Sequence, residues 1–261
     1  MSRPRLRRLA FAACAVACLA IAPAAAEQSG GGGVVVRFKA TLAPSLLPRQ
    51  GAAPVTLTLS GGVRGDEGTT PPRLSRIELA FASQGRLDAS GLPTCPRSRL
   101  RNATRRQALA RCREALVGRG TILAEVPLAA ERPISARAAA LAFNGMEAGH
   151  RVVWVHAYSA SPPISFVLPF SVRMLRHGPF GLLLDAPIAR TLGRWPRLRA
   201  FRITLGRRYR SHGSRHSYLA ARCPLPPRLN SLTVPLARAT YRFDPAPTHA
   251  ITILRACRAS G

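Results

Sequence analysis

The chain has 261 residues, of which 47% are hydrophobic and 19% are charged. This balance excludes a disordered chain, and the length is sufficient for a substantial core. No apolar run reaches the roughly 18–20 residues that a membrane-spanning helix needs, which argues against an integral membrane protein. The charge is unusual: 39 basic residues face 11 acidic ones, the formal net charge is +28, and every basic residue except Lys39 is Arg.

The N-terminus has the three-part organisation of a secretory signal peptide. Four Arg within residues 3–8 precede an apolar stretch, residues 9–21, that is too short to span a membrane stably. Three consecutive Ala at positions 24–26 then offer the small side chains that signal peptidase accepts. We therefore predict that residues 1–26 are removed and that the protein is exported to the medium or the cell envelope. A lipid anchor on Cys18 is the alternative address.

The segment after the predicted cleavage point contains four consecutive glycines. Such a composition is typical of a flexible linker, and residues 27–33 are interpreted as a tether. Residues 34–261 are then expected to form a single β-rich domain.

Alternation of apolar and polar residues predicts strands through most of this domain. Val55, Leu57 and Leu59 alternate with threonines, which is the pattern of a strand with one buried face. Further candidates are 34–39, 76–81, 121–126, 138–143, 152–158, 164–174, 180–185, 201–205, 217–221, 239–243 and 250–255. Gly61-Gly62 and Asn144-Gly145 are among the predicted turns between them. About a dozen strands without alternating helices predict a mainly β fold, an antiparallel β-sandwich or a barrel-like sheet.

One segment near residues 102–117 has helical periodicity instead. Its apolar residues at 108, 109, 112, 115 and 116 fall on a single stripe of a helix. Asn102 is the predicted N-terminal cap, and Gly118 is the predicted end.

Four cysteines remain once residues 1–26 are removed, and an even number in an exported chain suggests two disulfides. Proximity in sequence favours Cys95 with Cys112 and Cys223 with Cys257. A zinc site is the competing use, although no pair has the CxxC spacing.

The predicted mature chain keeps a net charge of +24, with dense Arg in residues 97–119 and 190–215. Such a charge attracts polyanions, for example acidic cell-wall polymers. Codon usage in a GC-rich genome is an alternative source of the excess Arg. The aromatic interleaving of a nucleic-acid platform is missing, so specific nucleic-acid binding is not expected.

Several short motifs are spread over most of the chain. They are Gly91-Leu92-Pro93-Thr94-Cys95, Ala108-Leu109-Ala110-Arg111-Cys112, Ala115-Leu116-Val117-Gly118, Leu141-Ala142-Phe143-Asn144-Gly145, Val167-Leu168-Pro169-Phe170, His216-Ser217-Tyr218-Leu219, Cys223-Pro224 and Pro235-Leu236-Ala237-Arg238-Ala239. These motifs resemble those of a family of uncharacterised secreted proteins from high-GC actinobacteria. The resemblance implies secretion and a compact disulfide-bonded body, and it implies no particular reaction.

Two segments carry candidate binding or catalytic residues. Trp154, His156 and Tyr158 share one face of a predicted strand and could stack on sugar rings, although ordinary core packing is the favoured explanation. The segment His212–Ser217 contains two His and two Ser, a composition compatible with a hydrolase, a metal site or a solvated hairpin loop.

The favoured function is therefore a non-catalytic extracellular or cell-envelope protein that binds acidic polymers. The alternative is an extracellular hydrolase that uses residues 212–217. No cofactor and no metal are expected.

Overall fold

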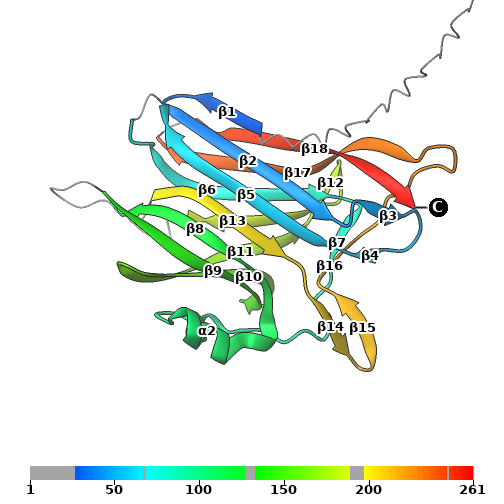
Figure 1. Ribbon diagram of the computed structural model, residues 1–261, viewed down its shortest axis with the longest axis horizontal. Helices are drawn as coiled ribbons and strands as arrows, with labels where there is room; N and C mark the ends of the chain where they lie inside the picture. The colour runs from blue at the N-terminus through cyan, green and yellow to red at the C-terminus, as the bar shows by residue number, and fades with distance from the viewer. Residues whose placement is uncertain (1–26, 67–68, 127–132, 189–196, 246, 261) are drawn as a thin grey trace, which may run out of the picture.

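The computed structural model describes residues 27–66, 69–126, 133–188, 197–245 and 247–260 (Figure 1). The strands are β1 Glu27–Gly31, β2 Val34–Ala43, β3 Leu46–Pro48, β4 Ala53–Pro54, β5 Thr56–Gly65, β6 Arg73–Ala82, β7 Gly85–Leu87, β8 Leu116–Val126, β9 Ile134–Glu147, β10 His150–Ala160, β11 Pro163–Met174, β12 Phe180–Pro187, β13 Arg197–Leu205, β14 Arg208–Ser211, β15 Ser214–Ser217, β16 Leu219–Ala221, β17 Ser231–Asp244 and β18 His249–Ser260. The helices are α1 Arg97–Leu100, α2 Arg105–Cys112 and a 3-10 turn, Arg113–Ala115. The predicted signal peptide, residues 1–26, lies outside the described residues.

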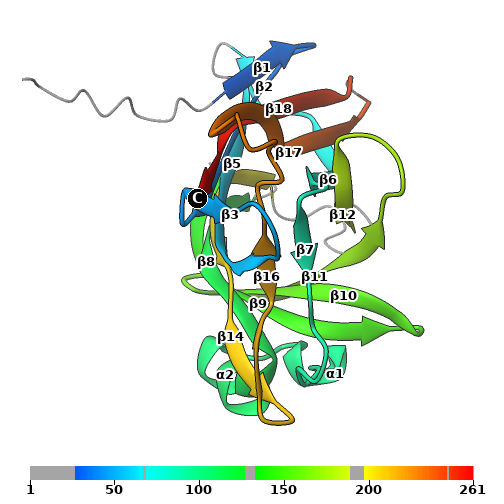
Figure 2. The same ribbon diagram turned by 90° about the vertical axis from the view of Figure 1, so that its right-hand side faces the viewer.

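Thirteen of these strands form one curled sheet in the order β1-β2-β5-β13-β8-β9-β10-β11-β12-β6-β17-β18-β3. Neighbouring strands are antiparallel except β18 and β3, which are parallel. Figure 2 shows β5 and β8 on one side of the curl, β6 and β12 on the other, and β9 and β10 between them at the bottom. The curl brings β1 next to β18, where Ser29 Oγ lies 3.3 Å from His249 Nδ1. The predicted mainly β fold is confirmed, in its barrel-like form.

The interior of the curl is the main core, and strand β2 shows why. Val34, Val36 and Phe38 are fully buried, while Arg37 between them is exposed. The side-chain period of two in a strand therefore directs one apolar face inward and one charged face to solvent.

Residues 27–31 are part of this sheet, so the interpretation of 27–33 as a tether is wrong for them. Strand β1 pairs with β2 from Glu27 opposite Phe38 to Gly31 opposite Val34. Backbone hydrogen bonds need no side chain, so a glycine-rich segment can add a strand to an open edge. The turn between the two strands uses positive φ angles at residues 32 and 33, which glycine adopts at little cost.

Two predicted turns lie inside strands instead. The pair Gly61-Gly62 belongs to β5, where a Cβ on Gly61 would stand 2.6 Å from the hydroxyl of Tyr241. Residues 144–145 belong to β9, and the two-residue loop that follows this strand is Ala148-Gly149, with φ angles of 48° and 78°. At positions 61 and 145, glycine allows a side chain of another strand to approach the backbone closely, and it does not reverse the chain.

The predicted helix exists, but both of its predicted boundaries differ. Helix α2 is capped by Thr104, whose hydroxyl accepts a hydrogen bond from the backbone N–H of Gln107 at 3.3 Å, and the Gln107 side chain accepts one from the Thr104 N–H at 2.8 Å. This reciprocal capping box satisfies two N–H groups of the first turn, which a cap at Asn102 could not do at that position. At the other end the 3-10 turn leads directly into β8, which contains Gly118.

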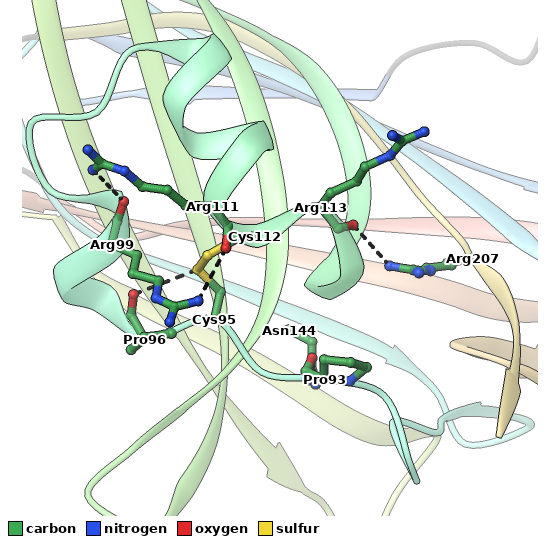
Figure 3. Close-up of a disulfide and its surroundings, with 9 residues drawn as sticks. All are labelled: Pro93, Cys95, Pro96, Arg99, Arg111, Cys112, Arg113, Asn144 and Arg207. Carbon is green, nitrogen blue, oxygen red and sulfur yellow. Dashed lines mark hydrogen bonds between the residues drawn. A yellow bond between two sulfur atoms is a disulfide. The ribbon is translucent and has the colours of Figure 1, made fainter. Parts of the chain in front are cut away.

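The helical segment covers the outer face of β9, β10 and β11 and creates a second core there. Its buried members from both sides are Cys95, Leu100, Ala103, Ala108, Cys112, Ala115, Leu141, Phe143, Val152, Trp154 and Val167. The predicted disulfide Cys95–Cys112 is confirmed and fastens the helix to the preceding loop (Figure 3). Closing a loop with a sequence separation of 17 stabilises the fold by about 3 kcal/mol in the chain-entropy model.

A small three-stranded sheet, β4-β16-β7, lies across one end of the curl, close to β3 (Figure 2). The second predicted disulfide, Cys223–Cys257, is also confirmed and ties the chain after β16 to β18. The backbone N–H of Cys223 donates to the carbonyl of Pro48 at 2.8 Å, which adds β3 to the same junction. None of the described helices is long and apolar enough to cross a membrane.

Candidate anion-binding groove

The three residues predicted to form a sugar-binding face lie on one side of β10, but most of that side is covered. Trp154 and His156 are 1% and 0% exposed, because the helical segment packs over them. Tyr158, further along the strand, stays partly exposed. A sugar ring cannot stack on a side chain that is already covered. Trp154 and His156 are therefore interior residues and not an open platform.

His156 anchors the connection between α1 and α2. Its Nε2 lies 2.9 Å from the carbonyl oxygen of Ala103, and the hydroxyl of Ser165 donates to the same oxygen at 3.1 Å. Because a carbonyl oxygen only accepts, Nε2 carries a proton here. Burial lowers the pKa of His156 and favours the neutral ring. Ser165 Oγ lies 3.2 Å from this nitrogen, but a nitrogen that already carries a proton cannot act as a base for that hydroxyl.

Residues 212–217, the other candidate, form the tip and second strand of the β14–β15 hairpin, as a hairpin-loop interpretation predicts. The two-residue loop is His212-Gly213, with φ angles of 48° and 77°. The imidazole of His216 stacks on Tyr209 with ring centroids 5.3 Å apart. These two rings dock the hairpin on the loop after β7, since the Tyr209 hydroxyl donates to the carbonyl of Ser90 at 3.0 Å.

The hydroxyl groups in this segment are not arranged for nucleophilic attack. Ser217 donates to the carbonyl of Leu219 at 2.7 Å, and Ser214 is exposed near the loop. In the part of the chain that the structure describes, no hydrogen bond joins either serine to a histidine. No three His, Cys, Asp or Glu side chains among the described residues gather closely enough to hold a metal ion.

Three arginines share the face of the hairpin opposite to the two docked rings. Strand alternation puts Arg208 and Arg210 on this face of β14, and the register places Arg215 of β15 directly across from Arg210. All three are exposed. The sequence that specifies this face, Arg-Tyr-Arg, alternates a charged residue with an aromatic anchor.

A groove of about 680 Å³ runs between this hairpin and the small sheet. The three hairpin arginines line it together with Arg86 of β7, which is also exposed. Among the described residues, no carboxylate lies within 4.0 Å of any of these four guanidinium groups. The groove is therefore strongly positive and open to solvent.

Among the described residues that line the groove, Asp88 is the single carboxylate, and it interacts with Ser90 and His216. The backbone N–H of Ser90 donates to Asp88 Oδ1 at 2.9 Å, and His216 Nδ1 lies 3.7 Å from Oδ2. The hydrogen bond from Ser90, with a smaller contribution from His216, lowers the pKa of Asp88 below its usual value. Asp88 thus contacts His216, and within the described part of the chain the four arginines have no carboxylate as a counter-ion.

The sequence alone predicted the arginine-rich hairpin of this site but not the contribution of Arg86 and Asp88. The density of Arg in residues 190–215 and the hairpin itself were visible in the sequence, but Arg86 and Asp88 lie more than a hundred residues away. Only the pairing of β7 with β16, which follows the hairpin in the chain, brings them to the groove. A lone Arg-x-Asp in a short strand carries no recognisable signal.

Scans against protein-family models, curated proteins and solved structures found no match, so no relative assigns a role to this groove.

Proposed function

We propose that the protein is a non-catalytic component of the extracellular space or the cell envelope that binds an acidic polymer through the groove beside β14–β15. The observation that carries this proposal is the set of four exposed guanidinium groups that have no carboxylate partner among the residues the structure describes. Guanidinium groups bind phosphate and carboxylate groups through paired, charge-assisted hydrogen bonds. A linear polyanion offers such groups at regular intervals.

The geometry of the hairpin supports an anionic ligand independently of its net charge. Arg210 and Arg215 face each other directly across the two strands, and like charges in that position destabilise a pair of strands. A two-stranded sheet is itself only marginally stable. An anion between the two side chains would remove the repulsion, whereas an empty groove leaves it in place.

The hydrolase alternative receives less support. Asp88 and His216 resemble two members of a catalytic triad, but the hydroxyl of Ser217 donates to a backbone carbonyl and the ring of His216 is held against Tyr209. A nucleophilic serine needs its hydroxyl hydrogen-bonded to the histidine base.

The groove is tested by binding to heparin and to duplex DNA over a series of salt concentrations. The triple variant Arg208→Gln, Arg210→Gln, Arg215→Gln removes three positive charges from the groove. We expect the slope of log affinity against log salt for DNA to fall by about 3, because each lost phosphate contact removes about one unit.

The matched control is Arg105→Gln, Arg106→Gln, Arg119→Gln, which removes the same charge from exposed positions elsewhere. It should leave most of the slope intact. Equal losses in the two triple variants would mean that total charge, and not the groove, determines binding, and would overturn the proposal.

Export through a cleavable signal peptide is part of the same proposal. The two disulfides suit an oxidising compartment. N-terminal sequencing of protein recovered from culture medium should give Glu27 as the first residue. A start at Met1, or a lipid attached to Cys18, would contradict this part.

A further inference from the structure

The curled sheet encloses an apolar cavity at the end that β3, β7 and β16 cover. Its volume is about 80 Å³. Inward-facing residues from many strands form most of the wall, among them Leu57, Phe81, Leu182, Leu184 and Leu205. The space is about half of the roughly 150 Å³ of an apolar cavity that binds benzene, so it suits a chain of a few carbons, and cavities lined in this way take up apolar groups rather than water.

One part of the wall is cationic. Arg86, Arg222 and Arg255 line the cavity together with Gln84. Because Arg86 and Arg222 are exposed, the cationic part is the part that reaches the surface of the protein. The cavity therefore has an apolar interior and a positively charged mouth.

Arg255 occupies a position where the strand pattern calls for an apolar residue. In β18 the side chains of Ile251, Ile253 and Cys257 point into the main core, and the period of two places Arg255 on that same face. Its side chain is partly buried, and one Nη donates to the carbonyl of Pro44 at 3.4 Å. Among the described residues, no carboxylate lies within 4.0 Å of this guanidinium.

A partly buried cation without a counter-ion is costly, and it calls for an explanation. Burial and the charge of Arg258 lower the pKa of Arg255, the direction expected for an uncompensated cation. Protection of an open strand edge is one explanation, because β3 pairs with β18 only from Arg258 onward. Edge protection, however, does not account for the apolar cavity beside the charge.

We propose that this cavity binds a carboxylate that carries a short, unbranched alkyl chain. The chain lies among the leucines of the interior, and the carboxylate pairs with the guanidinium of Arg255. Both features of the wall are then used, since the chain covers apolar surface and the carboxylate supplies the missing counter-ion. The cavity shares Arg86 with the groove beside β14–β15, but Arg255, which pairs with the carboxylate, does not line that groove.

The test compares three probes of equal chain length, butanoate, 1-butanol and butylammonium, on the full disulfide-bonded protein by isothermal titration calorimetry and by thermal unfolding. Butanoate should bind saturably and raise the unfolding temperature, and butylammonium should not. Arg255→Met, which keeps the length of the side chain and removes its charge, should weaken butanoate binding about ten- to hundredfold. The binding of 1-butanol should be unchanged by that substitution.

Two control variants separate this site from general charge effects. Arg258→Met removes an exposed charge from the same strand and should leave butanoate binding unchanged. The triple variant of the β14–β15 groove should also bind butanoate normally. Absence of saturable butanoate binding, or equal weakening by Arg255→Met and Arg258→Met, would overturn the proposal and leave edge protection as the role of Arg255. If Arg255→Met does not fold, the preference of the unaltered protein for butanoate over butylammonium still decides the question.

Discussion

Two tyrosines of the main core are equally buried, but among the described residues only one of their hydroxyl groups has a hydrogen-bond partner. The same substitution should therefore have opposite effects on the free energy of unfolding at the two positions. Tyr218 and Tyr241 are both 0% exposed. The hydroxyl of Tyr241 donates to the carbonyl of Arg37 at 3.1 Å. The hydroxyl of Tyr218 is buried without a hydrogen-bond partner in the described part of the chain.

Replacing each tyrosine by phenylalanine removes one oxygen and leaves the ring in place. A net hydrogen bond contributes about 1 kcal/mol, so Tyr241→Phe should lower the free energy of unfolding by about that amount. A buried polar group without a partner costs about 1–3 kcal/mol, so Tyr218→Phe should raise it by about 1 kcal/mol or more. In a chain of this size, 1 kcal/mol corresponds to about 2–4 °C in unfolding temperature.

The assay is urea and thermal unfolding of the oxidised protein, followed by circular dichroism at neutral pH. The two variants should differ by about 2 kcal/mol, with the unaltered protein between them. If both substitutions destabilise equally, the hydroxyl of Tyr218 has a hydrogen-bond partner and the reasoning fails.

Three further predictions concern packing, pH and salt. Gly145→Ala should lower the free energy of unfolding in urea by about 1–3 kcal/mol or more, because the added Cβ would overlap the indole of Trp154. The control Gly85→Ala should change it little, because a Cβ there meets its nearest neighbour at 3.4 Å. Burial lowers the pKa of His156 below its ordinary value of 6.5, so near and below that pH the unfolded chain binds more protons than the folded protein. The free energy of unfolding should therefore fall as the pH drops from 7.5 to 5.5. A His156→Gln variant whose free energy of unfolding has the same pH dependence would contradict this. The affinity for heparin, DNA and acidic wall polymer should fall steeply as salt rises and should differ little among the three, because exposed charges are screened over about 8 Å at physiological ionic strength. A complex with one polymer that survives about 0.5 M salt would contradict this low specificity.

The strands were predictable because burial on one face leaves a period of two in the sequence, as in the run from Val55 to Leu59. Glycine was less informative, since Gly61 and Gly145 are required by close contacts across the core and not by turns. The sequence could not distinguish the two uses, because Tyr241 reaches Gly61 across the curl of the sheet and Trp154 reaches Gly145 from the neighbouring strand β10.

The prediction of Asn102 as the helix cap was wrong for a related reason. Asn102 and Thr104 are both good capping residues, and only Gln107 three residues after Thr104 makes the second one reciprocal. The second core was also hidden, because an aromatic face on a strand looks the same whether a ligand or a helix covers it. Trp154 and His156 show the latter case.

The order of strands in the curled sheet determines when the chain can complete its fold. Strand β13 lies between β5 and β8, so these two strands stay separated until residues 197–205 are available. Strand β18 closes the other side with the last described residues, and it also carries Cys257 of the second disulfide. Contacts of such long sequence separation form slowly. The Cys95–Cys112 bond and the hairpin β9–β10 can form while the rest of the chain is still being delivered, but the core cannot. A chain built in this way completes its core only when its final strand is available.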